Sequence, residues 1–160
     1  MLKFISLLLV LMSGLSNNVP APEIAAEPLP RMVDRVARPF ESQPYFKASG
    51  HRGIDLADMT QELIRSPFAG KVSFSGIVFS RSVVTIRSES GLLASLEPVC
   101  VNVSQGQEVS AGEVIGSWCQ PDEDYQQHCE GCLHFSVRSQ RGYLNPLLFY
   151  GLVRPSKIVA

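Results

Sequence analysis

The sequence lacks an excess of charge of either sign, and after its first residues it lacks long apolar runs. The 160 residues include 14 Lys and Arg and 15 Asp and Glu, which gives a formal net charge of -1. Binding to a phosphate backbone needs a positive field, so we expect no nucleic acid partner. A membrane-spanning helix needs about 20 apolar residues, and no later stretch provides them.

The N-terminus is the one strongly apolar segment of the chain. Lys3 is its only charge, Phe4 to Met12 form an almost unbroken apolar run, and small and polar residues follow. This order is typical of a secretory signal peptide. The run is shorter than the roughly 20 residues of a membrane anchor, which is the alternative. Because no cysteine lies near its end, lipid attachment is not expected. We predict a signal peptide at residues 1–18 and a secreted or cell-envelope protein with no membrane span once the signal is removed.

The next segment is rich in Pro, Ala and Glu, and its prolines interrupt any helix. We predict a partly extended linker at residues 19–37. The remainder, residues 38–155, is of ordinary size for one compact domain, and we expect it to be a monomer.

The domain also lacks the apolar repeat at helical spacing that would indicate a long helix. It has short β-like segments instead, separated by turn signals such as Ser90-Gly91 and Gln105-Gly106. These segments lie at residues 71–75, 83–86, 92–96, 113–116 and 133–137. The pattern predicts an all-β domain built from antiparallel strands.

Three residues have the types and order of a catalytic zinc site. His51 and Asp55 are four positions apart with a glycine between them, and His134 lies in a β-like run about 80 residues later. Two imidazoles and a carboxylate, with water as the fourth ligand, are typical of catalytic rather than structural zinc. Taken alone, a surface histidine and a loop-capping aspartate would be the simpler interpretation.

Four motifs in order strengthen the metal interpretation: Gly-His-Arg-Gly-Ile-Asp-Leu-Ala at residues 50–57, and the segments 66–72, 106–116 and 133–135. Together they resemble the lysostaphin/LytM family of zinc metallopeptidases. The resemblance implies a lysostaphin-type, duplicated-hybrid-motif-like antiparallel β-sheet core with a groove that holds zinc. It implies His51, Asp55 and His134 as the zinc ligands. It also implies peptidoglycan peptides as the substrate.

The chain departs from this family at two catalytic positions. The His-x-His motif is replaced by Cys132-Leu133-His134, and the other catalytic histidine falls at or near Glu97. Glutamate beside zinc-activated water serves as a base in other metallopeptidases, so Glu97 is the candidate catalytic residue. A solvent-facing carboxylate is its alternative role. His128 is the remaining histidine, and its polar loop makes a catalytic role the less favoured interpretation.

Four cysteines in an exported chain indicate two disulfides with three possible connectivities. We favour Cys129–Cys132 and Cys100–Cys119, although Cys100 could instead bridge to the pair near the site. A metal knuckle of Cys129 and Cys132 with the flanking histidines is the alternative. It is disfavoured because all its ligands would crowd into seven residues and because export favours disulfides. An oxidised Cys132 would also exclude a cysteine protease.

These observations leave three hypotheses for the function. The favoured one is an exported zinc metallo-endopeptidase that cleaves peptidoglycan peptides, with Glu97 as the base. The second is a catalytically degenerate homologue that binds cell wall or regulates another murein hydrolase. The third is a carbohydrate-binding β module without metal. Arg52 and Arg138 are interpreted as plain surface residues rather than as contacts for acidic stem peptides.

Overall fold

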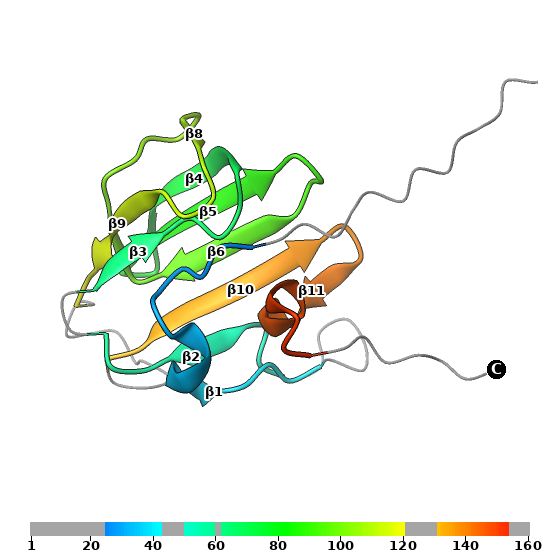
Figure 1. The fold of residues 1–160 in the computed structure, drawn as a ribbon. Helices are drawn as coiled ribbons and strands as arrows, with labels where there is room; N and C mark the ends of the chain where they lie inside the picture. The colour runs from blue at the N-terminus through cyan, green and yellow to red at the C-terminus, as the bar shows by residue number, and fades with distance from the viewer. Residues whose placement is uncertain (1–24, 43–49, 60–61, 121–130, 154–160) are drawn as a thin grey trace, which may run out of the picture.

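The computed structural model describes residues 25–42, 50–59, 62–120 and 131–153 (Figure 1). Neither of its two short 3-10 helices is long and apolar enough to cross a membrane. The elements in chain order are η1 (Met32–Arg35), β1 (Val36–Arg38), β2 (Ile54–Leu56), β3 (Leu63–Arg65), β4 (Gly70–Val78), β5 (Arg81–Ser88), β6 (Leu93–Glu97), β7 (Val99–Val101), β8 (Glu108–Val109), β9 (Val114–Trp118), β10 (Leu133–Ser139), β11 (Gly142–Leu144) and η2 (Pro146–Tyr150).

The described strands form two sheets in which every pairing is antiparallel. The larger sheet has eight strands in the order β1-β2-β10-β6-β5-β4-β8, with β11 also paired to β10. The smaller sheet has the order β3-β9-β7. Figure 1 shows β10 running through the middle of the large sheet, between β6 and β2. The all-β antiparallel prediction is confirmed, and the five predicted segments overlap β4, β5, β6, β9 and β10.

The two faces of the large sheet differ in polarity, as β10 illustrates. Its side chains alternate between the faces because strand residues have a period of two. Leu133, Phe135 and Val137 are buried in the hydrophobic core. The alternate positions on the same strand are polar: His134, Ser136 and Arg138. The apolar face of the sheet therefore packs into the core, and the polar face carries the candidate functional side chains.

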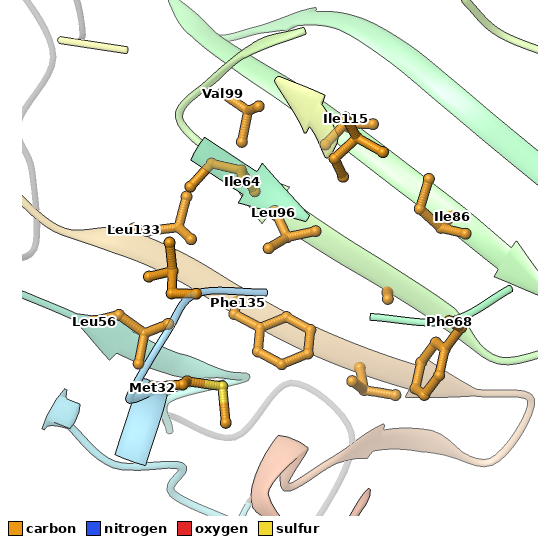
Figure 2. Close-up of a cluster of buried hydrophobic side chains, with 14 of the residues drawn as sticks. Met32, Leu56, Ile64, Phe68, Ile86, Leu96, Val99, Ile115, Leu133 and Phe135 are labelled. Carbon is orange, nitrogen blue, oxygen red and sulfur yellow. The ribbon is translucent and has the colours of Figure 1, made fainter. Parts of the chain in front are cut away.

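The small sheet covers the apolar face of the large one. Figure 2 shows Ile64 of β3 and Ile115 of β9 beside Leu96 of β6, with Phe135 of β10 further along the same cluster. All four side chains are fully buried. Each contributes about 1.5–3 kcal/mol by leaving water. This core holds β6 and β10 side by side. The same register determines which side chains are neighbours on the polar face.

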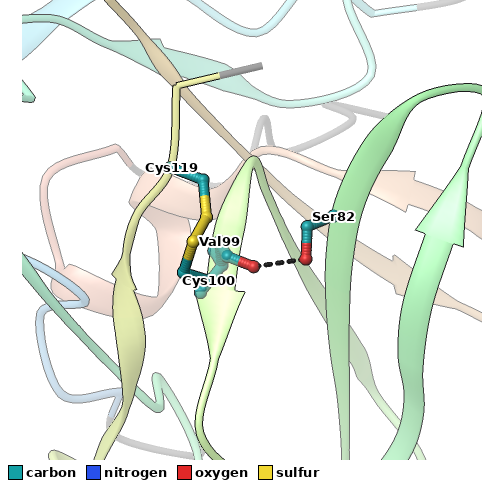
Figure 3. Close-up of a disulfide and its surroundings, with 4 residues drawn as sticks. All are labelled: Ser82, Val99, Cys100 and Cys119. Carbon is teal, nitrogen blue, oxygen red and sulfur yellow. Dashed lines mark hydrogen bonds between the residues drawn. A yellow bond between two sulfur atoms is a disulfide. The ribbon is translucent and has the colours of Figure 1, made fainter. Parts of the chain in front are cut away.

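A disulfide and a hydrogen bond fasten β7 on both sides. Cys100 of β7 is bonded to Cys119, which follows β9, with 5.2 Å between their Cα atoms (Figure 3). The hydroxyl of Ser82 in β5 donates a hydrogen bond to the carbonyl of Val99 and so joins the two sheets. The structure thus contains the Cys100–Cys119 pairing expected from the sequence.

The domain begins earlier in the chain than the sequence predicts. Leu29 and Met32 are fully buried in the core, and β1 pairs with β2. The linker prediction for residues 19–37 is therefore wrong for residues 25–37, and residues 19–24 lie outside the described part. The prolines exclude a long helix here, but a segment that contains only the short helix η1 can still bury its apolar side chains.

A hydrogen bond ties this N-terminal segment to the end of the domain. The hydroxyl of Tyr150 in η2 donates to the carbonyl oxygen of Ala26 at 3.0 Å. Burial, with a further contribution from the charge of Glu27, raises the pKa of Tyr150 above its ordinary range. The phenol therefore stays protonated and remains a donor throughout the neutral and moderately alkaline range.

Replacing Leu29 by Ala tests whether the N-terminal segment belongs to the fold. We expect Leu29→Ala to lower the free energy of unfolding by about 2–5 kcal/mol, because it leaves a cavity in the core. Val33→Ala is the matched control, since Val33 is 40% exposed in the same segment and should change stability by only about 0.5 kcal/mol. Urea unfolding of both variants would measure this. Equal effects would mean that the segment is not part of the cooperative core.

Candidate metal centre

The strand order places three chemically important residues in one row across the polar face. His134 of β10 lies directly opposite Asp55 of β2 on one side and Glu97 of β6 on the other. Directly opposite residues of antiparallel strands project from the same face, with Cβ atoms about 4.5–5.5 Å apart. Residues far apart in the sequence are therefore brought together by backbone pairing alone. His51 joins them from the loop that precedes β2.

The three predicted ligands converge on a single point. Asp55 Oδ1 lies 3.1 Å from His51 Nε2 and 2.7 Å from His134 Nδ1. One potential ligand atom from each residue lies within 4.8 Å of the others, and the two imidazole centroids are 5.0 Å apart. Among the described residues this is the one cluster of His, Cys, Asp and Glu with such spacing.

A backbone carbonyl sets the orientation of His51. Its Nδ1 lies 2.7 Å from the carbonyl oxygen of Pro39, which can only accept a hydrogen bond, so Nδ1 carries the proton. In the neutral ring Nε2 then has a lone pair, and this lone pair faces the Asp55 carboxylate. A cation between the two atoms would satisfy both, and a hydrogen bond from the far nitrogen is the usual support of a metal-binding histidine.

Asp55 is a buried carboxylate whose charge depends on its neighbours. Burial alone would raise its pKa, but the hydrogen bond and charge of His134, with smaller effects of His51, hold the pKa below its ordinary value of 3.8. Its second oxygen, Oδ2, is buried without a hydrogen-bond partner among the described residues. An ionised, incompletely satisfied carboxylate beside two imidazoles fits a divalent cation, and the N/N/O donor set fits zinc.

The two histidines of the cluster, His51 and His134, line an open pocket. His51 and Asp55 are buried, whereas the side chain of His134 is 22% exposed. The pocket has a volume of about 500 Å3. It is lined by Arg38, Gly50, His51, Arg52, Val78, Arg81, Val83, Ser95, Glu97, His134, Ser136 and Tyr143. Access from one side is what distinguishes a catalytic metal site from a closed structural one.

Gly53 explains why the motif has a glycine between His51 and Asp55. A Cβ atom at this position would collide with the carbonyl oxygen of Phe135 and would lie 2.8 Å from the His134 ring. Glycine is the residue that permits so close an approach of two backbones. The His134 imidazole therefore rests directly against the loop that carries His51.

Glu97 lies in the pocket and is ion-paired. Its Oε1 is 2.6 Å from a terminal guanidinium nitrogen of Arg81, and the two side chains are 18% and 22% exposed. Arg81, at the start of β5, is the site residue that sequence reasoning missed. It belongs to no motif, and only the pairing of β5 with β6 brings it beside Glu97.

The remaining sequence candidates do not add to the cluster. Cys132 is buried and disulfide-bonded, so it is neither a free thiol nor a thiolate ligand. Its carbonyl accepts a hydrogen bond from the indole of Trp118 at 3.2 Å. The metal-knuckle alternative therefore loses one of its ligands. Cys129 and His128 lie outside the described residues.

Comparison with known proteins is consistent with this site. Peptidase family M23 matches residues 49–146, which is more than half of the chain and includes all three candidate ligands. The chain belongs to Peptidase family M23. An uncharacterized protein of Mycobacterium tuberculosis is 33% identical over 127 residues. That match covers 77% of this chain and 49% of the relative, so the chain spans about half the length of that protein.

Two solved structures share the fold of this chain. The SpoIIQ–SpoIIIAH pore-forming complex contains a chain with a TM-score of 0.66 and 24% identity, covering 81% of this chain and 92% of that one. The catalytic domain of the antimicrobial peptidase lysostaphin from Staphylococcus simulans has a TM-score of 0.58 and 17% identity, covering 75% and 95%. At these identities the likeness establishes the fold alone. The lysostaphin-type fold expected from the sequence is confirmed.

Zinc titration tests the three-residue site in this M23 domain. We expect the wild type to bind one zinc ion and to gain about 2.7 kcal/mol of stability at a free concentration 100-fold above the dissociation constant. Asp55→Asn should bind far less, because it removes the anionic ligand at the centre of the cluster. Ser136→Ala, which alters the same pocket without removing a ligand, should bind like the wild type. Bound zinc and melting temperature are the readouts, and a wild type that binds no zinc would contradict the assignment.

The role of Gly53 is tested by adding one methyl group. Gly53→Ala should displace the His134 ring and lower zinc affinity about tenfold or more, the usual effect of disturbing the support of a ligand. Gly76→Ala in β4 is the control, because its new methyl would meet only the ring of Phe74. Competition with a chromogenic chelator would measure both affinities. Unchanged affinity in Gly53→Ala would show that the close approach does not position His134.

Proposed function

We propose that this protein is an exported zinc metallo-endopeptidase that cleaves peptide bonds of bacterial peptidoglycan. The observation that carries the proposal is the convergence of His51, Asp55 and His134, with the Pro39 carbonyl leaving a His51 lone pair directed at the cluster. Membership of Peptidase family M23 supports peptide hydrolysis. The apolar N-terminal run supports export, and residues 1–18 remain the proposed signal peptide.

Each residue has a distinct role in this proposal. His51, Asp55 and His134 would hold zinc, which when bound supplies activation of a water molecule and polarisation of the scissile carbonyl. Ser95 and Ser136 form part of the polar lining along which a peptide would lie. Glu97 is placed next to His134 in the row and accepts the proton of the attacking water.

The ion pair with Arg81 bears directly on the role of Glu97. It orients the carboxylate in the pocket, so a potential proton acceptor is positioned before substrate binds. The same guanidinium supplies positive charge in the pocket, where negative charge develops as the scissile carbonyl is attacked. We infer that Arg81 and Glu97 work as a unit in place of the catalytic histidines that the family resemblance predicts.

A specific observation favours a second function. Cys132 stands where the resemblance predicts a histidine, and its sulfur is held in a disulfide, so it offers no base. One structural neighbour is part of a complex described as pore-forming rather than as a peptidase. The alternative is therefore a degenerate homologue that binds cell wall or regulates another murein hydrolase through the same pocket.

Substitution of Glu97 separates the two functions. Glu97→Gln should reduce the rate of muropeptide release by about 10²–10⁴, the usual contribution of a general base, with zinc content unchanged. Asp34→Asn is the control, because it neutralises an exposed carboxylate of η1 that does not line the pocket. The assay is chromatography of soluble products released from purified peptidoglycan by the zinc-loaded protein.

The outcomes divide clearly. A full rate in Glu97→Gln would remove Glu97 from the mechanism. Zinc-loaded wild type that releases no product from any peptidoglycan would refute the enzyme and leave the degenerate homologue.

A further inference from the structure

A second row of directly opposite residues crosses the polar face of the large sheet, four positions along β10 from His134. Arg138 pairs with Tyr143 of β11 on one side and with Leu93 of β6 on the other. Leu93 pairs in turn with Arg87 of β5, and Arg87 pairs with Lys71 of β4. Such pairs share a face of the sheet, so the three cations project on the same side as the metal cluster. We call Lys71, Arg87 and Arg138 the cationic row.

The cations of this row form no ion pairs with described residues, although Glu89 and Glu108 line the same hollow as Lys71 and Arg87. All three side chains are exposed, and none forms an ion pair with a described acidic residue. Lys71 and Arg87 are like charges on directly opposite residues, an arrangement that destabilises a sheet. Glu108 of β8 is opposite Lys71 on its other side, but no ion pair joins them. An external anion bound at the row would offset the repulsion between Lys71 and Arg87.

Arg52 extends the positive charge from the row to the metal pocket. Its guanidinium carbon lies 5.5 Å from the centroid of the Tyr143 ring, and that of Arg138 lies 6.0 Å from the same centroid. Arg52 also has no acidic partner among the described residues, and it lines the metal pocket together with Tyr143. Two cations held over one aromatic ring at the end of the pocket are well placed to meet a carboxylate.

A hollow lies near each end of the row. Tyr143 lines the metal pocket, while Lys71 and Arg87 line a second hollow of about 440 Å3 at the other end of the row. His134 and Arg138 are separated by four residues of strand, which is about 13 Å. An extended peptide advances by a similar 3.3 Å per residue, so groups within about four residues of a bond facing the metal cluster would reach the row.

We propose that the cationic row, with Arg52, binds the carboxylates of peptidoglycan stem peptides and so selects anionic peptides for the metal centre. This inference rests on the proposed function and adds the charge of the substrate to it. A guanidinium binds a carboxylate through two parallel hydrogen bonds, which gives both affinity and orientation. In this proposal Arg138 contacts the substrate, whereas the sequence suggested a plain surface residue. Lys71 and Arg87 also belong to the binding surface.

Charge removal tests the row without relying on catalysis. The probes are a soluble muropeptide with free carboxylates and the same muropeptide with every carboxylate amidated, each titrated calorimetrically into the zinc-loaded, oxidised protein. The combined variant Lys71→Gln, Arg87→Gln, Arg138→Gln should bind the free muropeptide about fivefold more weakly or worse at low ionic strength, as expected from losing several exposed ion pairs. The difference should shrink in high salt. It should be absent for the amidated probe.

Two controls separate binding from folding. Arg31→Gln removes one positive charge at the exposed N-cap of η1, away from the row, and should leave affinity unchanged. The combined variant should melt at the same temperature as the wild type or slightly higher, because it removes the repulsion between Lys71 and Arg87. A residue set with a merely structural role would lower the melting temperature instead.

Several results would overturn the row. These are equal binding of the free and amidated probes by the wild type, unchanged affinity in the combined variant, or tighter binding of a phosphate polymer such as an oligonucleotide than of the muropeptide. Failure of the proposed function is distinguishable. Binding that depends on the row without any hydrolysis refutes the peptidase and keeps the row, whereas hydrolysis with an unchanged KM in the combined variant refutes the row and keeps the peptidase.

Discussion

The hydrogen-bonding register of β10 is the constraint on which the rest of the molecule depends. A slip of one residue against β2 and β6 would turn His134 into the core and Phe135 into the pocket, because successive strand residues point to opposite faces. The apolar face prevents this slip. Leu133, Phe135 and Val137 are all buried, and exposing them would cost several kcal/mol in total. Packing on the apolar face of β10 therefore holds the three candidate ligands in position on its polar face.

The same register buries the Asp55 carboxylate beside two imidazoles without satisfying both of its oxygens. Asp55 is buried with one oxygen lacking a partner, and its ionised form depends on the two imidazoles. A buried carboxylate without full compensation costs more than an exposed one. That cost arises at the centre of a site where the Nε2 of His51 and the Nδ1 of His134 both face the carboxylate. Such an arrangement is one that a divalent cation completes.

Much of this could be predicted from the sequence, for identifiable reasons. The strands were visible because β4, β5 and β10 have alternating or β-branched residues, and His51, Asp55 and His134 stood in ordered motifs. The N-terminal segment was misassigned because its prolines suggested a linker, while the burial of Leu29 depends on a core formed by distant strands. Arg81 could not be found in the same way. Its importance arises from the pairing of β5 with β6, and a single sequence does not reveal which strands are neighbours.

The two departures from the family pattern, Cys132 and Glu97, together determine which groups the pocket offers for catalysis. Because Cys132 is held in a disulfide, the position two residues before His134 supplies no base. The candidate base is then Glu97, which lies directly opposite His134. Glu97 in turn depends on Arg81, whose guanidinium approaches to 2.6 Å from the neighbouring strand. A histidine pair can exchange protons at neutral pH, whereas an arginine stays charged and a carboxylate mainly accepts. The pocket therefore offers an ion pair beside the candidate metal centre. Because this pair has no net charge, the proposed attraction of anionic peptides depends instead on Arg52 and Arg138, which meet over Tyr143.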